Sequence, residues 1–384
     1  MGGLSATAPE IVEAVREQLA REHGELTPHR VADVLRRQGR PVGDDAVRAI
    51  HDLLRRSAFG VGVLEPLIDD ESVTDVLVNG AGPVWVDRGR GLERTDVELV
   101  DEAEVRRLAQ RLAGLGGRRL DDATPWCDVR LPDGTRFHAV LAPVARPGTL
   151  ISLRVPRARA FALEDLVTNR ALTAPGARLL GDVVARRLAF LVSGGTGSGK
   201  TTLLATMLGL VPPTERIVLV EDSSELRPEH PHVVALEARP ANVEGRGAVD
   251  LRLLVRQALR MRPDRLVVGE VRGGEVVDLL AAMNTGHEGG AGTLHANAAT
   301  QVTARIEALA VTAGLGRDAA MSQLGAAVDL VLHVVRGEDG VRRLAEVAVP
   351  SRGQDGTRMV TALTFAADGT LAEGPAADDL ARRL

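Results

Sequence analysis

A glycine-rich segment in the second half of the chain combines the residue types that bind phosphate groups. It runs from Gly194 to Thr201 and reads Gly-Gly-Thr-Gly-Ser-Gly-Lys-Thr. Glycine lets backbone N–H groups face a phosphate, and lysine adds a compact positive charge. Arginine supplies all but one of the 47 basic residues, so the single lysine, Lys200, stands where a planar guanidinium would fit poorly. The segment predicts binding of a nucleoside triphosphate such as ATP.

The residues around this segment supply the strand and the helix that a phosphate-binding loop requires. Residues 188–193 form a short apolar run typical of a buried strand, and residues 201–208 are typical of a helix. In that setting Lys200 would reach the β- and γ-phosphates, and the Thr201 hydroxyl would bind Mg²⁺. The nucleotide-binding residues predicted from this loop are Gly195, Thr196, Gly197, Ser198, Gly199, Lys200, Thr201 and Thr202.

Two further apolar strands each end in an acidic residue. Residues 216–220 precede Glu221, and residues 265–269 precede Glu270. Parallel strands bind ligands at their carboxyl ends, so Glu221 and the adjacent Asp222 should face the crevice that holds the phosphate loop. An acid closing an apolar strand is the Walker B arrangement, which makes Glu270 a second residue that supports Mg²⁺. The alternative for either residue is an ordinary solvated strand end.

A fourth segment, from Thr285 to Asn297, places two histidines in glycine-rich backbone. His287 and His295 lie eight residues apart, which is compatible with contacts to a γ-phosphate. Ordinary polar contacts are the alternative. A zinc site is not expected, because no third ligand lies near in the sequence.

The predicted elements divide the chain into four parts. Residues 1–58 have apolar positions at helical spacing, and residues 59–156 mix strands, a helix over 102–112 and a hairpin centred on Pro132-Asp133-Gly134. Residues 157–175 are predicted to link this small α+β domain to the next. Strands and helices then alternate over 176–384, which indicates an α/β domain with a largely parallel sheet.

Composition excludes several function classes. A net charge of -5 gives no overall attraction to nucleic acid or to an anionic membrane, and an aromatic content of 2% disfavours binding of single strands by stacking. The single cysteine, Cys127, excludes an intramolecular disulfide and fits a reducing cytoplasm. No apolar run reaches the roughly 20 residues that span a bilayer, so any membrane association should be peripheral.

Together, these elements resemble the type II and type IV secretion ATPase superfamily, in the order Walker A, Asp box, Walker B and His box. The chain is most similar to the CpaF-like ATPases of tight-adherence (Flp) pilus assembly. That similarity rests on residues 75–80, 128–136 and 259–264. The resemblance implies a RecA-like ATPase domain preceded by a smaller, PAS-like domain. It also implies a cytoplasmic homo-hexamer that hydrolyses ATP with Mg²⁺, held at the inner face of the cytoplasmic membrane by a platform protein.

The same resemblance assigns roles to single residues. Glu221 matches the Asp-box acid that activates water, Glu270 matches the Walker B acid, and His287 and His295 match the His box. Three arginines of the small domain match positions suited to the γ-phosphate when the domains close: Arg130, Arg136 and Arg154. For these, surface arginines of an arginine-rich chain are the alternative.

Other functions are compatible with parts of this pattern. A conjugation or type IV secretion ATPase would share all four motifs. A nucleic-acid translocase on a RecA-like core is less favoured, because no stable nucleic-acid partner is expected from the charge and the aromatic content. A GTPase would need a second lysine for its Asn-Lys-x-Asp motif, and the chain has none.

Overall fold

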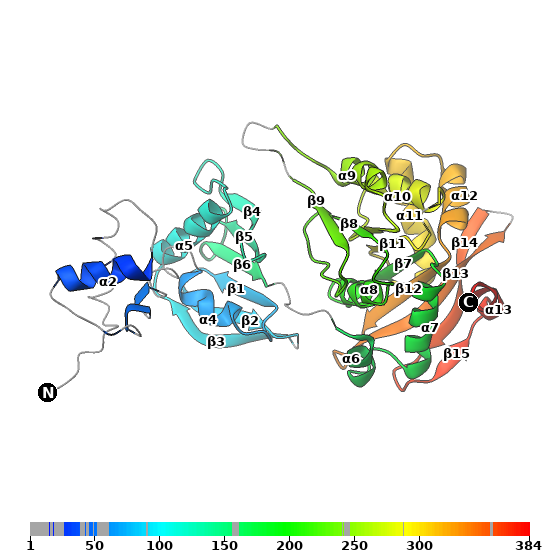
Figure 1. The fold of residues 1–384 in the computed structure, drawn as a ribbon, viewed down its shortest axis with the longest axis horizontal. Helices are drawn as coiled ribbons and strands as arrows, with labels where there is room; N and C mark the ends of the chain where they lie inside the picture. Colours follow the sequence, from blue (N-terminus) through cyan, green and yellow to red (C-terminus); the bar gives the residue numbers. More distant parts are fainter. Residues whose placement is uncertain are drawn as a thin grey trace. The chain divides into compact units, whose positions relative to one another are not determined.

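The structure, a computed structural model, divides the chain into two compact units, Met1–Ala158 and Arg159–Leu384. It describes residues 27–38, 61–89, 91–155, 161–239, 246–286, 288–353 and 356–384, with a few isolated positions between 15 and 51 and residue 241. Figure 1 shows the elements of both units. Each unit has a hydrophobic core of its own.

In segment 1–58 the structure gives the bounds of helix α2 (Pro28–Arg37), and the isolated described positions 15, 18, 46–48, 50 and 51 are also helical. The buried residues of α2, Val31, Val34 and Leu35, share one face because they recur at helical spacing. The Thr27 hydroxyl caps the helix by accepting a hydrogen bond from the N–H of Arg30 at 3.4 Å. The helical prediction is confirmed here, and most other positions of segment 1–58 lie outside the described residues.

An antiparallel sheet of six strands forms the body of the first unit, in the order β3-β2-β1-β6-β5-β4. The strands are β1 (Asp75–Asn79), β2 (Gly82–Asp87), β3 (Leu92–Leu99), β4 (Trp126–Arg130), β5 (Arg136–Val140) and β6 (Leu150–Arg154). Its helical elements are η1 (Gly62–Leu64), α4 (Glu65–Ile68) and α5 (Glu102–Leu115). The predicted hairpin is confirmed as β4 and β5, joined by a turn in which Gly134 has a φ of 92°.

The second unit contains a sheet of nine strands, in the order β15-β14-β13-β12-β7-β11-β10-β8-β9. Its first six strands in sequence are β7 (Phe190–Gly194), β8 (Ile217–Glu221), β9 (Val233–Glu237), β10 (Arg265–Val268), β11 (Ala291–Leu294) and β12 (Leu330–Arg336). These six pair in parallel. The remaining three, β13 (Arg342–Gly353), β14 (Gly356–Phe365) and β15 (Leu371–Glu373), extend the sheet antiparallel. The prediction of an α/β fold is confirmed.

Helices cover both faces of this sheet, so its central strands are apolar on both sides (Figure 1). Along β7, Phe190 and Val192 belong to one core and Leu191 to the other. The first core includes α6 (Leu163–Thr168), α7 (Ala174–Ala185), α8 (Lys200–Gly209) and α13 (Ala377–Arg383). The second includes α9 (Leu251–Ala258), α10 (Glu275–Met283), α11 (Val302–Thr312) and α12 (Arg317–Ala327), with the short turns η2 (Leu259–Met261) and η3 (Ala299–Gln301) nearby.

The predicted linker, residues 157–175, differs in the structure from a simple connection. Its described part contains α6, and Leu166 and Leu172 are buried in the first core of the second unit. The alternating Arg and Ala residues at its start gave no sign of this packing, and the described apolar residues that pack on the core begin at Phe161.

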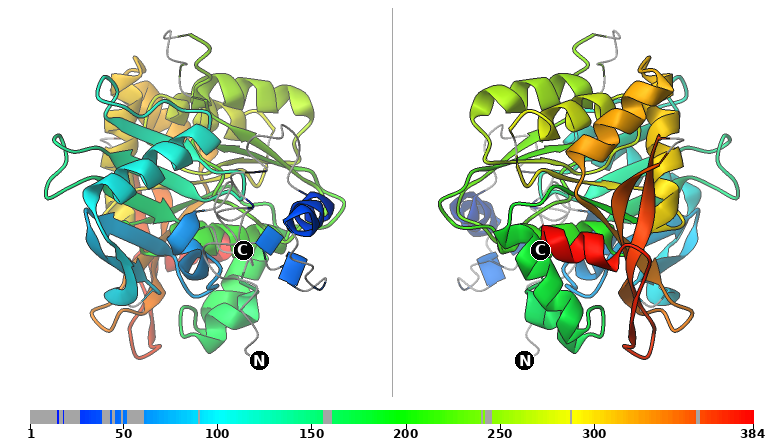
Figure 2. Two further views of the ribbon diagram at one scale, coloured as in Figure 1. Left: turned by 90° about the vertical axis from the view of Figure 1, so that its left-hand side faces the viewer. Right: turned by 90° about the vertical axis from the view of Figure 1, so that its right-hand side faces the viewer.

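Figure 2 shows the C-terminal helix α13 beside the strands of the antiparallel extension. Leu380 of this helix is buried in the same core as Ala362 of β14. Among the described residues, no helix is both long enough and apolar enough to cross a membrane.

Candidate functional site

The glycine-rich loop connects β7 to α8, as the sequence predicted. Gly194 ends the strand, and a Cβ atom at this position would lie 2.3 Å from the carbonyl oxygen of Val334. Gly199 has a φ of 99°, in the left-handed region that favours glycine. Both glycines are therefore required by the path of the backbone. That path places the loop at the amino terminus of α8, where N–H groups are available to an anion.

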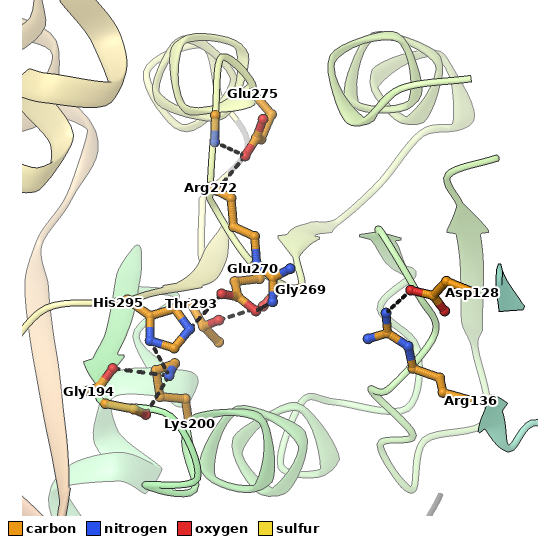
Figure 3. A network of polar contacts seen from close by, with 12 residues as sticks. Asp128, Arg136, Gly194, Lys200, Gly269, Glu270, Arg272, Glu275, Thr293 and His295 are labelled. Carbon is orange, nitrogen blue, oxygen red and sulfur yellow. Dashed lines mark hydrogen bonds and ion pairs between the residues drawn. The ribbon is translucent and has the colours of Figure 1, made fainter. Parts of the chain in front are cut away.

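Lys200 is buried within this loop and points back across it (Figure 3). Its Nζ donates to the carbonyl oxygens of Gly194 at 3.0 Å and Gly195 at 2.8 Å, and it lies 3.4 Å from Nδ1 of His295. Burial lowers the pKa of the Lys200 ammonium, and the charge of Glu270 opposes that change. The carbonyl oxygens of the loop thus hold the Lys200 ammonium.

Glu270 follows β10 and joins this cluster through His295 (Figure 3). One carboxylate oxygen lies 2.8 Å from Nε2 of His295, and the other accepts from Arg272 at 2.6 Å. Burial opposes ionisation of Glu270, yet the hydrogen bond and charge of Arg272, with smaller effects of His295 and Lys200, lower its pKa. Burial and the charge of Lys200 lower the pKa of His295, which favours the neutral imidazole. Three segments distant in sequence therefore meet in one polar cluster.

Buried hydrogen bonds hold the backbone around Glu270. The Thr293 hydroxyl donates to the carbonyl oxygen of Gly269 at 2.6 Å, and the N–H of Val271 donates to the carbonyl oxygen of Thr293 at 2.7 Å. The buried carboxylate of Glu275 accepts from the N–H groups of Arg272 and Gly273, at 2.6 and 2.7 Å. The turn that carries Glu270 is thus fixed from both sides.

Glu221, the last residue of β8, is 3% exposed. One of its oxygens accepts from the N–H groups of Glu225 and Leu226, at 3.0 and 2.9 Å. The other is buried and has no hydrogen-bond partner among the residues that the structure describes. Burial raises the pKa of Glu221 to about 7, although the two backbone hydrogen bonds lower it. A carboxylate with these properties is suited to accepting a proton near neutral pH.

Gly269 makes room for Glu221. A Cβ atom at position 269 would lie 2.6 Å from Cγ of Glu221 and 3.1 Å from its Oε1. We expect Gly269→Ala to displace the carboxylate, to destabilise the fold by roughly 1 to 3 kcal/mol and to lower the turnover of any reaction that uses Glu221. Thermal unfolding and steady-state kinetics measure both effects. Gly181→Ala is the control, because a Cβ atom there meets nothing within 4 Å; an equal loss of turnover in both variants would contradict this role.

The remaining loop residues also lie where the sequence predicted. Thr201 and Thr202 are in the first turn of α8, and the hydroxyl of Ser198 donates to the carbonyl oxygen of Gly195 at 2.9 Å. The described residues contain no cluster of three His, Cys, Asp or Glu side chains that would hold a metal ion by themselves. One hydroxyl and one ionised carboxylate, Thr201 and Glu270, match instead the way Mg²⁺ is held with phosphate oxygens and water. His287 lies outside the described residues.

The three arginines predicted in the small domain form a row on neighbouring strands of the first unit. In the strand register, Arg130 of β4 lies opposite Arg136 of β5, and Arg136 lies opposite Arg154 of β6. Arg136 lies 3.5 Å from Asp128, and Arg154 lies 3.3 Å from Asp75. The Nε of Arg130 donates to the carbonyl oxygen of Gly134 at 3.4 Å. The sheet register thus brings these guanidinium groups to one end of the sheet.

Several residues at the loop were not predicted from the sequence. Nε of Arg342, at the start of β13, donates to the carbonyl oxygen of Gly197 at 2.8 Å. In an arginine-rich chain no local signal marks this residue. His333 of β12 lies 2.9 Å from the hydroxyl of Ser193, directly before the loop. The signal that could have identified His333 is its position inside an otherwise apolar strand. Arg272, next to Glu270, was also not predicted as a site residue.

Comparison with known proteins gives one family. The family model described as "Type II/IV secretion system protein" matches residues 58–360. A putative conjugal transfer protein of Mycobacterium tuberculosis is 57% identical over 326 residues, covering 83% of this chain and 93% of that protein. The conjugal transfer protein TrbB of Rhizobium radiobacter is 33% identical over 285 residues, covering 73% and 84%.

A solved structure gives the same picture of the fold. The pilus retraction motor PilT with bound ADP aligns with a TM-score of 0.53 at 21% identity, covering 83% of this chain and 84% of that one. At this identity the likeness concerns the fold alone.

Proposed function

Because this chain belongs to the family of type II/IV secretion system proteins, we propose that it is an ATPase that couples ATP hydrolysis to mechanical work in a pilus-assembly or secretion machine. The observation that carries the proposal is the contact of Lys200 with His295, and of His295 with Glu270. Loops that follow neighbouring parallel strands bring these residues together. Open α/β sheets bind ligands at that end of their strands.

In this proposal the loop backbone and Lys200 hold the β- and γ-phosphates of ATP. Lys200 exchanges its contacts with the carbonyl oxygens of Gly194 and Gly195 for phosphate oxygens. Thr201 and Glu270 would hold Mg²⁺ and its water. Bound there, Mg²⁺ would supply positive charge that offsets the negative charge developing during phosphoryl transfer. The low pKa of Glu270 keeps it ionised for this role.

Glu221 acts in this proposal as the base that accepts a proton from the attacking water. Its second oxygen is buried and has no hydrogen-bond partner among the described residues. This oxygen can therefore accept a hydrogen bond from a water molecule that enters with the nucleotide. Its other oxygen is fixed by two backbone N–H groups, which orients the carboxylate. Positioning of this kind is the main contribution that a protein makes to phosphoryl transfer.

The arginine row of the first unit, Arg130, Arg136 and Arg154, is proposed to contact the γ-phosphate when the two units close around ATP. Arginines on a separate unit would couple closure to the state of the nucleotide. We expect Arg136→Ala to lower kcat about tenfold or more while ADP affinity stays unchanged. Steady-state kinetics and ADP titration measure this. Arg106→Ala, on α5 of the same unit, is the control and should hydrolyse ATP as the wild type does. Normal kcat for Arg136→Ala would remove Arg136 from the site.

We infer that the working form is a homo-hexamer in which the second unit is a RecA-like core and the first is PAS-like. The hexamer would act at the cytoplasmic face of the inner membrane by binding a platform protein. Size-exclusion chromatography with light scattering, and ATPase assays with and without the cytoplasmic part of that protein, test this. A monomer whose ATPase activity ignores the partner contradicts the motor function.

Two kinds of machine are compatible with this motor. The similarity of residues 75–80, 128–136 and 259–264 to CpaF-like proteins favours a tight-adherence pilus. The names of two relatives, both conjugal transfer proteins, favour a type IV secretion or conjugation machine instead. Stimulation of ATPase activity by the platform protein of one machine and not by the corresponding component of the other distinguishes them. DNA added to the same assay should have no effect, because no nucleic-acid partner is expected.

A further inference from the structure

A buried histidine lies beside the phosphate loop and has no part in the proposed chemistry. His333 of β12 is 4% exposed and lies in an otherwise apolar stretch from Leu330 to Val335. It is in register with Ser193 on β7, the residue directly before Gly194. Its Nδ1 lies 2.9 Å from the Ser193 hydroxyl, which is itself fully buried. A polar pair in such a place requires complete hydrogen bonding, since an unsatisfied buried group is costly.

The backbone of Asn297 also acts on this imidazole and favours its protonated form. Asn297 belongs to the loop after β11, and β11 lies on the opposite side of β7 from β12. His333 therefore connects the strand that leads into the phosphate loop with a loop from beyond that strand. That second loop carries His295, which contacts both Lys200 and Glu270.

The strand next to β12 anchors the same loop a second time. Glu346 of β13 is in register with His333, and its carboxylate accepts from the N–H of Ala299 at 3.1 Å. Two charged groups act on the His333 ring, Glu346 from β13 and Lys200 from α8. Burial and the charge of Lys200 lower the pKa of His333, while Glu346 and the backbone of Asn297 raise it. The neutral imidazole offers one donor and one acceptor, which matches its two partners.

We propose that His333 is a positioning residue that ties the phosphate loop to the loop carrying His295, so that the site distinguishes ATP from ADP. The inference rests on the proposed function and deepens it. The contacts of the phosphate loop with the β-phosphate are common to ATP and ADP. The His295 loop meets Lys200 and Glu270, the residues assigned to the γ-phosphate and its Mg²⁺. Loss of the His333 link therefore affects the state that contains a γ-phosphate.

The test is equilibrium binding of fluorescent ADP and of a non-hydrolysable ATP analogue to the full chain with Mg²⁺. For His333→Leu we expect ADP affinity to stay near the wild-type value and the affinity for the ATP analogue to fall about fivefold to tenfold, the effect of one or two lost hydrogen bonds. Ser193→Ala removes only one partner of His333. It should therefore lower the ratio of ATP-analogue affinity to ADP affinity by a smaller factor. His333→Gln keeps a donor and an acceptor and should retain more of the preference than His333→Leu.

Val331→Ala is the matched control, because it opens a cavity on the same buried strand without removing a polar link. It should leave the ratio of the two affinities unchanged. An unchanged ratio in His333→Leu, or an equal loss of both affinities, overturns the inference. If His333→Leu does not fold, the ratio for Ser193→Ala decides in the same way. A wild-type chain that binds neither nucleotide contradicts the proposed function itself, so the two failures are distinguishable.

Discussion

Lys200→Ala should lower kcat/KM for ATP by roughly 10²-fold to 10³-fold or more, because it removes the cation assigned to the transferred phosphate. In the structure Lys200 is buried and its ammonium is held by two loop carbonyl oxygens close to His295. The chain has no other lysine that could replace it. Steady-state phosphate release and titration with ATP measure the loss.

Lys200→Arg is the informative companion to this variant. It keeps the positive charge but replaces a compact ammonium by a planar guanidinium in a slot where the lysine is 8% exposed. We expect it to remain as inactive as Lys200→Ala, while both variants unfold near the wild-type temperature. Full activity of either variant would remove Lys200 from the phosphate site.

Glu221→Gln should lower kcat by about a hundredfold or more, since general-base catalysis typically contributes a factor of 10² to 10⁴. Nucleotide affinity should stay close to the wild-type value, because the proposed phosphate contacts come from other residues. Rapid-quench measurement of hydrolysis and separate binding titrations distinguish these effects. Glu225→Gln is the control: the Glu225 side chain is exposed, and its backbone N–H still donates to Glu221. Normal turnover by Glu221→Gln would exclude it as the base.

The raised pKa of Glu221 gives this variant a pH signature as well. Burial raises the folded-state pKa to about 7 from an ordinary value of 4.5. The free energy of unfolding of the wild type therefore falls as pH rises from the ordinary pKa through the folded-state pKa, because ionisation of Glu221 favours the unfolded chain. The amide of Glu221→Gln stays neutral, and the variant should be more stable than the wild type at pH 8 by on the order of 2 to 3 kcal/mol and equally stable near pH 4. The wild-type kcat/KM should rise with pH across the same region. Thermal unfolding and initial rates from pH 5 to 9 test both trends.

The phosphate loop and the acidic strand ends could be predicted because their signals are local. A glycine-rich turn between an apolar strand and a helix has few alternatives, and Glu221 and Glu270 each follow a run of apolar residues. Parallel strands then bring their carboxyl ends to one edge of the sheet, whatever their order. The hairpin at Gly134 was predictable for the same reason, since its turn residues are adjacent in sequence.

Residues that depend on the order of strands could not be predicted. Ser193 and His333 are separated by 140 residues, and Arg342 contacts Gly197 across 145. Their contacts exist because β12 pairs with β7 and β13 then pairs with β12. Nothing in the local pattern of either strand specifies its neighbour. The buried environment of α6 was missed for a similar reason, because its apolar residues pack on a core formed largely by later segments.

We propose that Lys200, Glu221, Glu270 and His295 form a site that hydrolyses ATP. The most direct test is the rate of phosphate release from ATP by the purified full chain with Mg²⁺, measured beside Lys200→Ala and Glu221→Gln together with their nucleotide affinities. We predict that the wild type hydrolyses ATP, that Lys200→Ala loses turnover and ATP affinity, and that Glu221→Gln binds ATP without turning it over. A wild-type chain that releases no phosphate, or a Glu221→Gln variant that hydrolyses ATP at the wild-type rate, would contradict this assignment of the site.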